Sequence, residues 1–481
     1  MNDNNGLIAP LYKALVEYCQ ENNVLLHMPG HKGGRGLFPP EYKAIGALDH
    51  TEVPGLDDLH MPQGVIREAQ SLAAQAWGAD ASFFLVNGAT SGIQALMVGF
   101  NEGEKILVPR NAHRSFLGGL ILSGAIPVYL DCVIDPDINA AVAVTPGEVA
   151  DKLVQHPDMA GLCLVSPTFY GTVNDIRAMA DMVSARDIPL IVDEAHGGHF
   201  AFAPDYPQPA LACGAAACVH GLHKTLPVLT QAGIMHLTAG FARAVRVQAA
   251  YDTLTTTSPS YPLMASIDVG RAIMERDGKF LLESAKESAG LCRAAINKIP
   301  GLRCRAEEFA ASEGIVDYDP LKILVEVIDL DLSGYRLAED LRRRCSIQVE
   351  MAGDNYVLAM FSPFNEWSDW EELARGLEVC TAGIGRQTGF LEVAVMPPIP
   401  DQAMTPRQAF MASKISVNIE ESAGHISGEM VAGYPPGIPC LMPGEVITEN
   451  IRDYILELRD NKVPLHGLSD REYLHIYIVD I

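Results

Sequence analysis

The chain has 481 residues, 48% of them apolar and 20% charged, a balance typical of a globular protein with two or three domains. Its formal net charge is −25 without a basic patch or tail, which argues against a nucleic-acid partner. The N-terminus lacks the basic residues of a signal peptide, and no apolar run is long enough to cross a bilayer.

The ten cysteines are scattered along the chain, with no C-x-x-C pair. Most of them lie within apolar runs, as does Cys163, which is typical of reduced core residues. We therefore expect a cytoplasmic protein with no membrane partner.

The N-terminal part of the chain predicts one helix followed by loops. Apolar residues at helical spacing predict an amphipathic helix over residues 6–23. The basic, glycine-rich segment 27–36 is interpreted either as a surface loop or as an arm that packs near a phosphate or a partner subunit. A second loop over residues 49–64 precedes a helix predicted over residues 65–77.

A strand and a glycine-rich turn follow in the sequence SFFLVNGATSG. The turn, residues 87–92, opens a helix whose free backbone N–H groups are predicted to bind an anion. The hydroxyls of Thr90 and Ser91 would add donors, although both residue types are also ordinary helix N-caps. No Gly-Lys-Ser/Thr ends the turn, so it is not a Walker A motif.

Apolar strands alternate with helical patterns as far as residue 193, which predicts a parallel sheet covered by helices on both faces. Ligands of such sheets bind beyond the carboxyl ends of the strands. Four strand ends carry candidate site residues, namely 87–91, 110–113, 166–170 and 193–196.

Asp193 ends the apolar strand IPLIVD, and Lys224 follows a histidine after the next apolar stretch. Pyridoxal phosphate needs a lysine that forms a Schiff base with its aldehyde and an acid that keeps its ring nitrogen protonated. Taken singly, the aspartate could be a helix cap and the lysine a solvated surface charge. A metal site of Asp193, His196 and His199 is a further alternative, but its spacing does not match a helical ligand pair, and we predict no metal.

The second half of the chain predicts smaller modules. Long helices over residues 265–299 precede a β-rich segment, and a proline-rich stretch separates that segment from a C-terminal part of about 75 residues. Prolines 435, 436, 439 and 443 exclude this part from a sheet centre. The predicted divisions are an N-terminal helix and arm (1–50), a large cofactor-binding domain (51–300), a small α/β domain (301–395) and a C-terminal module (405–481).

A set of motifs in one order covers nearly the whole chain: HMPGHKGG, DDLHMPQGVI, NGATSG, NAHRS, DEAHGGHF, the His-Lys dipeptide with Gln231, and YPPGIPCLMPGE. With them the chain resembles the Orn/Lys/Arg decarboxylases, and it is most similar to their shorter Gram-positive branch. The resemblance implies an α/β protein with an aspartate-aminotransferase-like (fold type I) large domain and a mostly parallel sheet. A smaller α/β domain and a C-terminal α+β module would follow.

By position, the resemblance assigns the pyridoxal phosphate site to Gly88, Ala89, Thr90, Ser91, His113, Asp193, Ala195, His196, His223, Lys224 and Ser258. Lys224 would be the Schiff-base lysine and Asp193 the partner of the ring nitrogen. His113, unless it is only a loop histidine, would stack on one ring face opposite Ala195. The turn at 88–91 would bind the phosphate, with Ser258 completing that site either within one chain or from across a dimer interface. The catalytic residues would be Lys224 and Asp193, with His196 and His223 beside the cofactor.

The implied reaction is decarboxylation of a basic amino acid for polyamine synthesis. We rank arginine to agmatine first, then lysine to cadaverine and ornithine to putrescine. A homodimer or a higher homo-oligomer is expected. The alternatives are a fold type I aminotransferase or C–S lyase, or a catalytically silent regulator that binds pyridoxal phosphate.

Three positions depart from the family pattern. Gly221 replaces a serine three residues before the lysine, which removes a phosphate hydroxyl and is expected to weaken cofactor affinity. Arg114 stands where lysine is common, and His425 where arginine is common. The cofactor residues are retained, so catalysis is still expected, and the departures bear on the choice of substrate.

Overall fold

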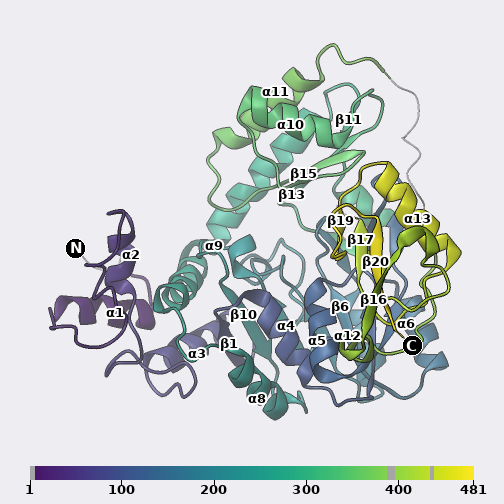
Figure 1. Ribbon diagram of the computed structural model, residues 1–481. Helices are drawn as coiled ribbons and strands as arrows, with labels where there is room; N and C mark the ends of the chain where they lie inside the picture. The colour runs from purple at the N-terminus through teal and green to yellow at the C-terminus, as the bar shows by residue number, and fades with distance from the viewer. Residues whose placement is uncertain (1–5, 387–395, 434–437, 481) are drawn as a thin grey trace. The chain divides into compact units, whose positions relative to one another are not determined.

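A computed structural model describes residues 6–386, 396–433 and 438–480 (Figure 1). The chain forms two compact units. The first comprises residues 1–99, 189–284 and 362–364, and the second comprises residues 100–188, 285–361 and 365–481. Each unit thus combines segments that are far apart in the sequence.

The first unit contains four neighbouring strands in the order β1-β10-β9-β8. Their bounds are β1 (Ala81–Leu85), β8 (Leu190–Asp193), β9 (Ala217–His220) and β10 (Gly233–Leu237). Strands β8 and β9 are parallel, whereas β10 is antiparallel to both β9 and β1. Every residue of β8, β9 and β10 is buried, which for β8 agrees with its predicted apolar strand.

The helices of the first unit are α1 (Pro10–Gln20), α2 (Tyr42–Leu48), α3 (Val65–Trp77), α4 (Gly88–Val98), α8 (Ala244–Leu254) and the start of α9 (Tyr261–Ile296). Helix α3 has its predicted bounds and ends at Gly78, whose φ of +71° forms a left-handed C-cap. Helix α1 is shorter than predicted, with Pro10 in its first turn. The glycine-rich turn is also shorter than predicted, because α4 already begins at Gly88.

The second unit contains three parallel strands in the order β6-β2-β3. These are β2 (Lys105–Pro109), β3 (Ile126–Leu130) and β6 (Met159–Val165), and they alternate with α5 (Arg114–Ser123), α6 (Pro146–Gln155) and α7 (Ile176–Ser184). The side chains of Thr145 and Asp175 cap α6 and α7 as helix-start signals predict. The α/β class with mostly parallel strands is thereby confirmed.

The second unit also contains small antiparallel sheets. Two hydrogen-bonded pairs are β4 (Val133–Asp135) with β5 (Ala140–Ala143), and β7 (Thr172–Asn174) with β12 (Ile315–Tyr318). A four-stranded sheet of β11 (Leu302–Cys304), β13 (Lys322–Val327), β15 (Tyr356–Met360) and β14 (Met351–Ala352) accompanies α10 (Gly334–Cys345) and α11 (Ser368–Thr381).

Residues 396–480 include the C-terminal helices and strands: α12 (Pro406–Met411), β16 (Lys414–Asn418), β17 (Val431–Gly433), β18 (Pro439–Leu441), α13 (Glu449–Asp460), β19 (Leu465–His466) and β20 (His475–Val479). Pro439 begins the edge strand β18 of the order β18-β17-β19, consistent with its exclusion from a sheet centre. Pro435 and Pro436 lie outside the described residues. All ten cysteines are free thiols, and no described helix is both long and apolar enough to span a membrane.

Candidate functional site

Asp193 is the last residue of β8, and its side chain is almost fully buried, with 4% of the residue exposed. One carboxylate oxygen, Oδ1, accepts a hydrogen bond from the amide of Ala195 at 3.1 Å. A buried carboxylate is costly unless a cation or donor faces it. A protonated pyridine nitrogen is such a donor, so the burial of Asp193 fits the predicted cofactor.

Lys224 lies beside His196, in the loops that leave two neighbouring parallel strands. Strands β8 and β9 pair Asp193 with Val219, and the amide of Gly221 donates to the carbonyl of Ala195 at 3.2 Å. Beyond this link, Lys224 Nζ is 3.2 Å from His196 Nε2. The structure therefore brings the predicted lysine and histidine together at the carboxyl ends of β8 and β9, where α/β sheets bind ligands.

The N-terminus of α4 belongs to the same hydrogen-bonded network. The amide of Gly88 donates to the carbonyl of Gln231 at 2.9 Å, and the next carbonyl, of Ala232, accepts from the amide of His223. The helix has no side-chain cap, so the first-turn amides that follow the amide of Gly88 can donate to an anion. A side chain at Gly233 would place its Cβ 3.0 Å from the amide nitrogen of Ala89, so only glycine leaves this approach open.

For three other predicted site residues, the structure gives contacts with nearby residues of the chain. Ser91 is buried, and its hydroxyl donates to the carbonyl of Gly88 within α4. Ser258 is exposed between α8 and α9, where its hydroxyl and amide contact Thr256. His113 belongs to the second unit and caps α5, because its Nδ1 accepts from the amide of Ser115 at 3.2 Å. The roles of these residues in cofactor binding stay predictions.

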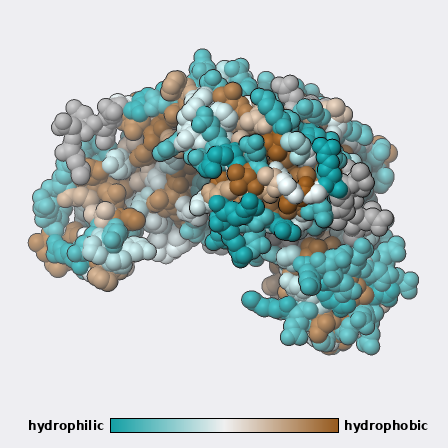
Figure 2. All heavy atoms as spheres, turned by 90° about the horizontal axis from the view of Figure 1, so that it is seen from above, coloured by the Kyte–Doolittle hydropathy of each residue, from teal (hydrophilic) through white to brown (hydrophobic). Residues whose placement is uncertain are grey.

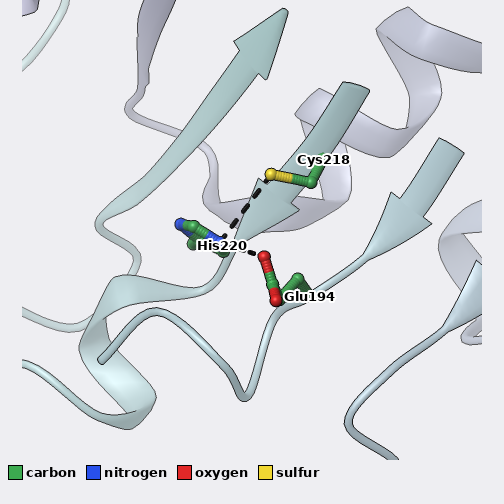
Figure 3. Close-up of side chains that lie close together, drawn as sticks. All are labelled: Glu194, Cys218 and His220. Atoms are coloured by element: carbon green, nitrogen blue, oxygen red, sulfur yellow. Dashed lines mark hydrogen bonds and ion pairs between the residues drawn. The ribbon is translucent and has the colours of Figure 1, made fainter. Parts of the chain in front are cut away.

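A buried cluster next to Asp193 was missed from the sequence (Figure 3). Glu194 and His220 are only 2% and 1% exposed, and Glu194 Oε2 lies 2.8 Å from His220 Nε2. Glu194 Oε1 also accepts from the amide of Ala210 at 2.9 Å. The signal available in the sequence was a second acid directly after Asp193 and a histidine at the end of the next strand.

Cys218 joins this cluster, with its sulfur 3.8 Å from His220 Nε2 (Figure 3). Among the described residues, Glu194, Cys218 and His220 are the group with metal-ligand geometry, rather than Asp193, His196 and His199. However, burial, followed by the nearby charge of Glu194, raises the pKa of Cys218 well above its ordinary value. Metals bind the thiolate, so we interpret the cluster as a hydrogen-bonded support for β8 and β9.

The buried His236 of β10 is expected to make the folded protein less stable in acid. Burial, and then the charge of His220, lowers the pKa of His236 well below 6.5. Above about pH 6.5, His236 is neutral in both the folded and the unfolded protein. Below that pH, the histidine binds a proton in the unfolded chain but not in the folded protein, so the free energy of unfolding decreases. We expect His236→Gln to flatten the decline of melting temperature between pH 6.5 and 5, with exposed His425→Gln as control. An unchanged decline would contradict this.

The chain matches one known protein family over most of its length. Residues 9–368 match the family described as "Orn/Lys/Arg decarboxylase, major domain", and residues 391–471 match the corresponding C-terminal domain. An arginine decarboxylase of Bacillus subtilis is 36% identical over 468 residues, covering 96% of each chain. Lysine decarboxylase LdcA of Pseudomonas aeruginosa is 26% identical and covers 94% of this chain and 76% of that protein.

Solved structures agree on the fold. The lysine decarboxylase LdcF of Francisella novicida superposes with a TM-score of 0.83 at 21% identity, covering 99% of this chain and 82% of that one. The ureidoglycine-glyoxylate aminotransferase of Bacillus subtilis superposes with a TM-score of 0.54 at 14% identity, covering 67% of this chain and 86% of that one. The expected fold type I architecture is confirmed.

Proposed function

The chain belongs to the Orn/Lys/Arg decarboxylase family, and we propose that it converts arginine to agmatine with release of carbon dioxide. The observation that carries this substrate is the 36% identity to arginine decarboxylases over nearly the full length of both chains. Lysine and ornithine rank second and third, since the lysine decarboxylases are more distant relatives. The product agmatine would feed polyamine synthesis.

Pyridoxal phosphate is the cofactor that this site would hold. Lys224 would bind it covalently, the buried Asp193 would face its ring nitrogen, and the uncapped N-terminus of α4 would bind its phosphate. His113 and Ala195 would pack on the two ring faces. When bound, the cofactor supplies an electron sink for the pair left at the α carbon when carbon dioxide departs.

The protein's own residues would manage protons and orientation. Asp193 would keep a proton on the ring nitrogen, because a nearby carboxylate favours the charged form of that base. Lys224 Nζ and His196 Nε2 are 3.2 Å apart, so the pair would deliver the proton that replaces the carboxylate. His223 is fixed beside them by its bonds to Ala232.

An aminotransferase would instead hold the substrate carboxylate in the ring plane, typically with an arginine. The sequence offers three arginines on α10, residues 342–344, for that task. Arg343 and Arg344 form ion pairs with Glu339 and Asp340 of the same helix, at 2.8 and 3.9 Å. Ion pairs on the helix surface account for Arg343 and Arg344, and Arg342 is an exposed residue of the same helix, which supports decarboxylation over transamination.

Product analysis tests the proposed function directly. Purified protein with added pyridoxal phosphate is incubated with arginine, lysine and ornithine separately, and carbon dioxide and amines are quantified. Agmatine formation with the highest kcat/KM for arginine is expected. Keto acid without carbon dioxide would indicate an aminotransferase, and absence of turnover on all three would contradict the proposal.

Gly221 provides a specific test of cofactor affinity. A Cβ there would lie 3.2 Å from both the backbone oxygen of Ala195 and Lys224 Cε, a tight approach that a serine and an alanine variant share. We expect Gly221→Ser to bind the cofactor about 3- to 10-fold more tightly than Gly221→Ala does, the effect of one added hydrogen bond worth about 1 kcal/mol. Gly221→Ala adds the Cβ without the hydroxyl and serves as control; equal cofactor affinity of the two variants would refute the hydroxyl's role.

A homodimer or a larger homo-oligomer is proposed as well. Apolar side chains are strongly exposed along the N-terminal segment, including Val24, Leu26, Met28 and Phe38, and apolar atoms reach the surface elsewhere too (Figure 2). A second copy of the chain would cover them, and light scattering that returned the mass of a single chain would exclude this. Ten free thiols fit the reducing cytoplasm proposed as its location.

A further inference from the structure

We propose that Glu445, in the C-terminal part of the chain, is a positioning residue for the connection between β2 and α5, which carries His113. An effect of Glu445 on cofactor affinity rests on the proposed function, whereas its effect on the order of the β2–α5 connection does not. The two residues belong to the same compact unit, although they are far apart in the sequence.

Glu445 holds Arg110, the first residue after β2, by a buried two-pronged ion pair. Arg110 donates from Nη1 to Glu445 Oε1 at 2.5 Å and from Nη2 to Oε2 at 2.8 Å, and the two side chains are 2% and 1% exposed. Glu445 Oε2 also accepts from the amide of Met442 at 2.7 Å. The carboxylate of Glu445 thus links the backbone at Met442 to Arg110.

The other groups of Arg110 are also occupied. Its Nε donates to the carbonyl of Pro439 at 2.8 Å, and its Nη2 donates to the carbonyl of Cys440 at 3.2 Å. The guanidinium lies 4.8 Å from the centre of the Tyr129 ring. A planar donor group held at so many points fixes the backbone from which it extends.

This backbone leads directly to His113. Only two residues, Asn111 and Ala112, separate Arg110 from the histidine that caps α5. Met430, Pro439 and Met442 of the C-terminal part line, together with His113 and Arg114, a void of only about 10 Å³. Helices α12 and α5 also pack together, near the C-terminal strands (Figure 1). The C-terminal residues therefore pack against the connection between β2 and α5.

Removing one charge leaves the other buried without compensation, so the connection should loosen. We expect Glu445→Gln to speed amide hydrogen exchange at least tenfold over residues 111–117 in the protein as purified. Where His113 stacks on the cofactor, the dissociation constant of pyridoxal phosphate should also rise about tenfold. The exchange measurement does not depend on any cofactor, so it distinguishes failure of the positioning role from failure of the proposed function.

Asp135→Asn is the matched control, because Asp135 accepts two hydrogen bonds from Arg305, at 2.9 and 3.0 Å, and is buried in the same unit. It should lower the melting temperature without changing exchange at 111–117 or cofactor affinity. Equal exchange changes in both variants, or none in Glu445→Gln, would overturn the proposal.

A double variant covers the case in which Glu445→Gln fails to fold. Arg110→Met with Glu445→Leu removes both charges together, and an apolar replacement of a buried ion pair is often tolerated. It also removes the bonds to Pro439 and Cys440, so exchange over residues 111–117 should still increase. Unchanged exchange in this folded variant would overturn the positioning role.

Discussion

Replacing Lys224 with alanine is expected to abolish both the visible absorbance of bound pyridoxal phosphate and turnover. The covalent link to the cofactor is lost, and with it the amine that lies 3.2 Å from His196, so kcat should fall by at least about 10³-fold. Absorbance spectra and carbon dioxide release measure the two effects.

The matched control is Lys279→Ala. This lysine is an exposed residue of α9 whose Nζ lies 3.9 Å from Glu283, so its loss should leave colour and turnover intact. A coloured, fully active Lys224→Ala protein would rule out Lys224 as the residue that binds the cofactor. Melting temperatures of both variants verify that each is folded.

Asp193→Asn is expected to give a coloured but nearly inactive protein. The amide occupies the same buried volume at the end of β8, and Lys224 can still bind the cofactor, but a neutral amide does not hold the ring nitrogen protonated. Loss of this electrostatic support should reduce kcat by about 10²- to 10³-fold. Steady-state kinetics at saturating cofactor separates this loss from weak cofactor binding.

A second buried carboxylate of the same unit provides the comparison. Asp268 pairs with Arg271 at 2.8 Å and accepts from the amide of Leu11 at 2.9 Å. Asp268→Asn should lower the melting temperature and leave kcat of the folded protein nearly unchanged. If Asp193→Asn behaved in the same way, Asp193 would have a structural role only.

The sequence predicted those parts of the fold that depend on local patterns. The apolar run IPLIVD identified β8, and the helical pattern over residues 65–77 gave the bounds of α3. The same reasoning placed Asp193 at a strand end and Lys224 on a short strand or loop after it. Asp193 does end β8, and Lys224 lies in the short 3-10 helix Leu222–Lys224 that follows the parallel neighbour β9. Helix ends were less accurate where the apolar spacing continued beyond the helix, as at α1.

Other features could not be predicted because they depend on which segments meet in space. The ion pair of Arg110 with Glu445 joins residues 335 positions apart, and no local pattern marks either as a partner of the other. Likewise, the bond between Glu194 and His220 requires the alignment of β8 with β9. Motif comparison identified residues near the site but not the contacts that support them.

The way in which His113 begins α5 has one more consequence. Its Nδ1 accepts from the Ser115 amide, so the ring proton of the neutral form resides on Nε2, on the far side of the ring. A ligand that turned this ring would also release the amide of the first helical turn. Binding of a ligand against the His113 ring and fraying of the first turn of α5 would then occur together, because the same rotation of the ring causes both.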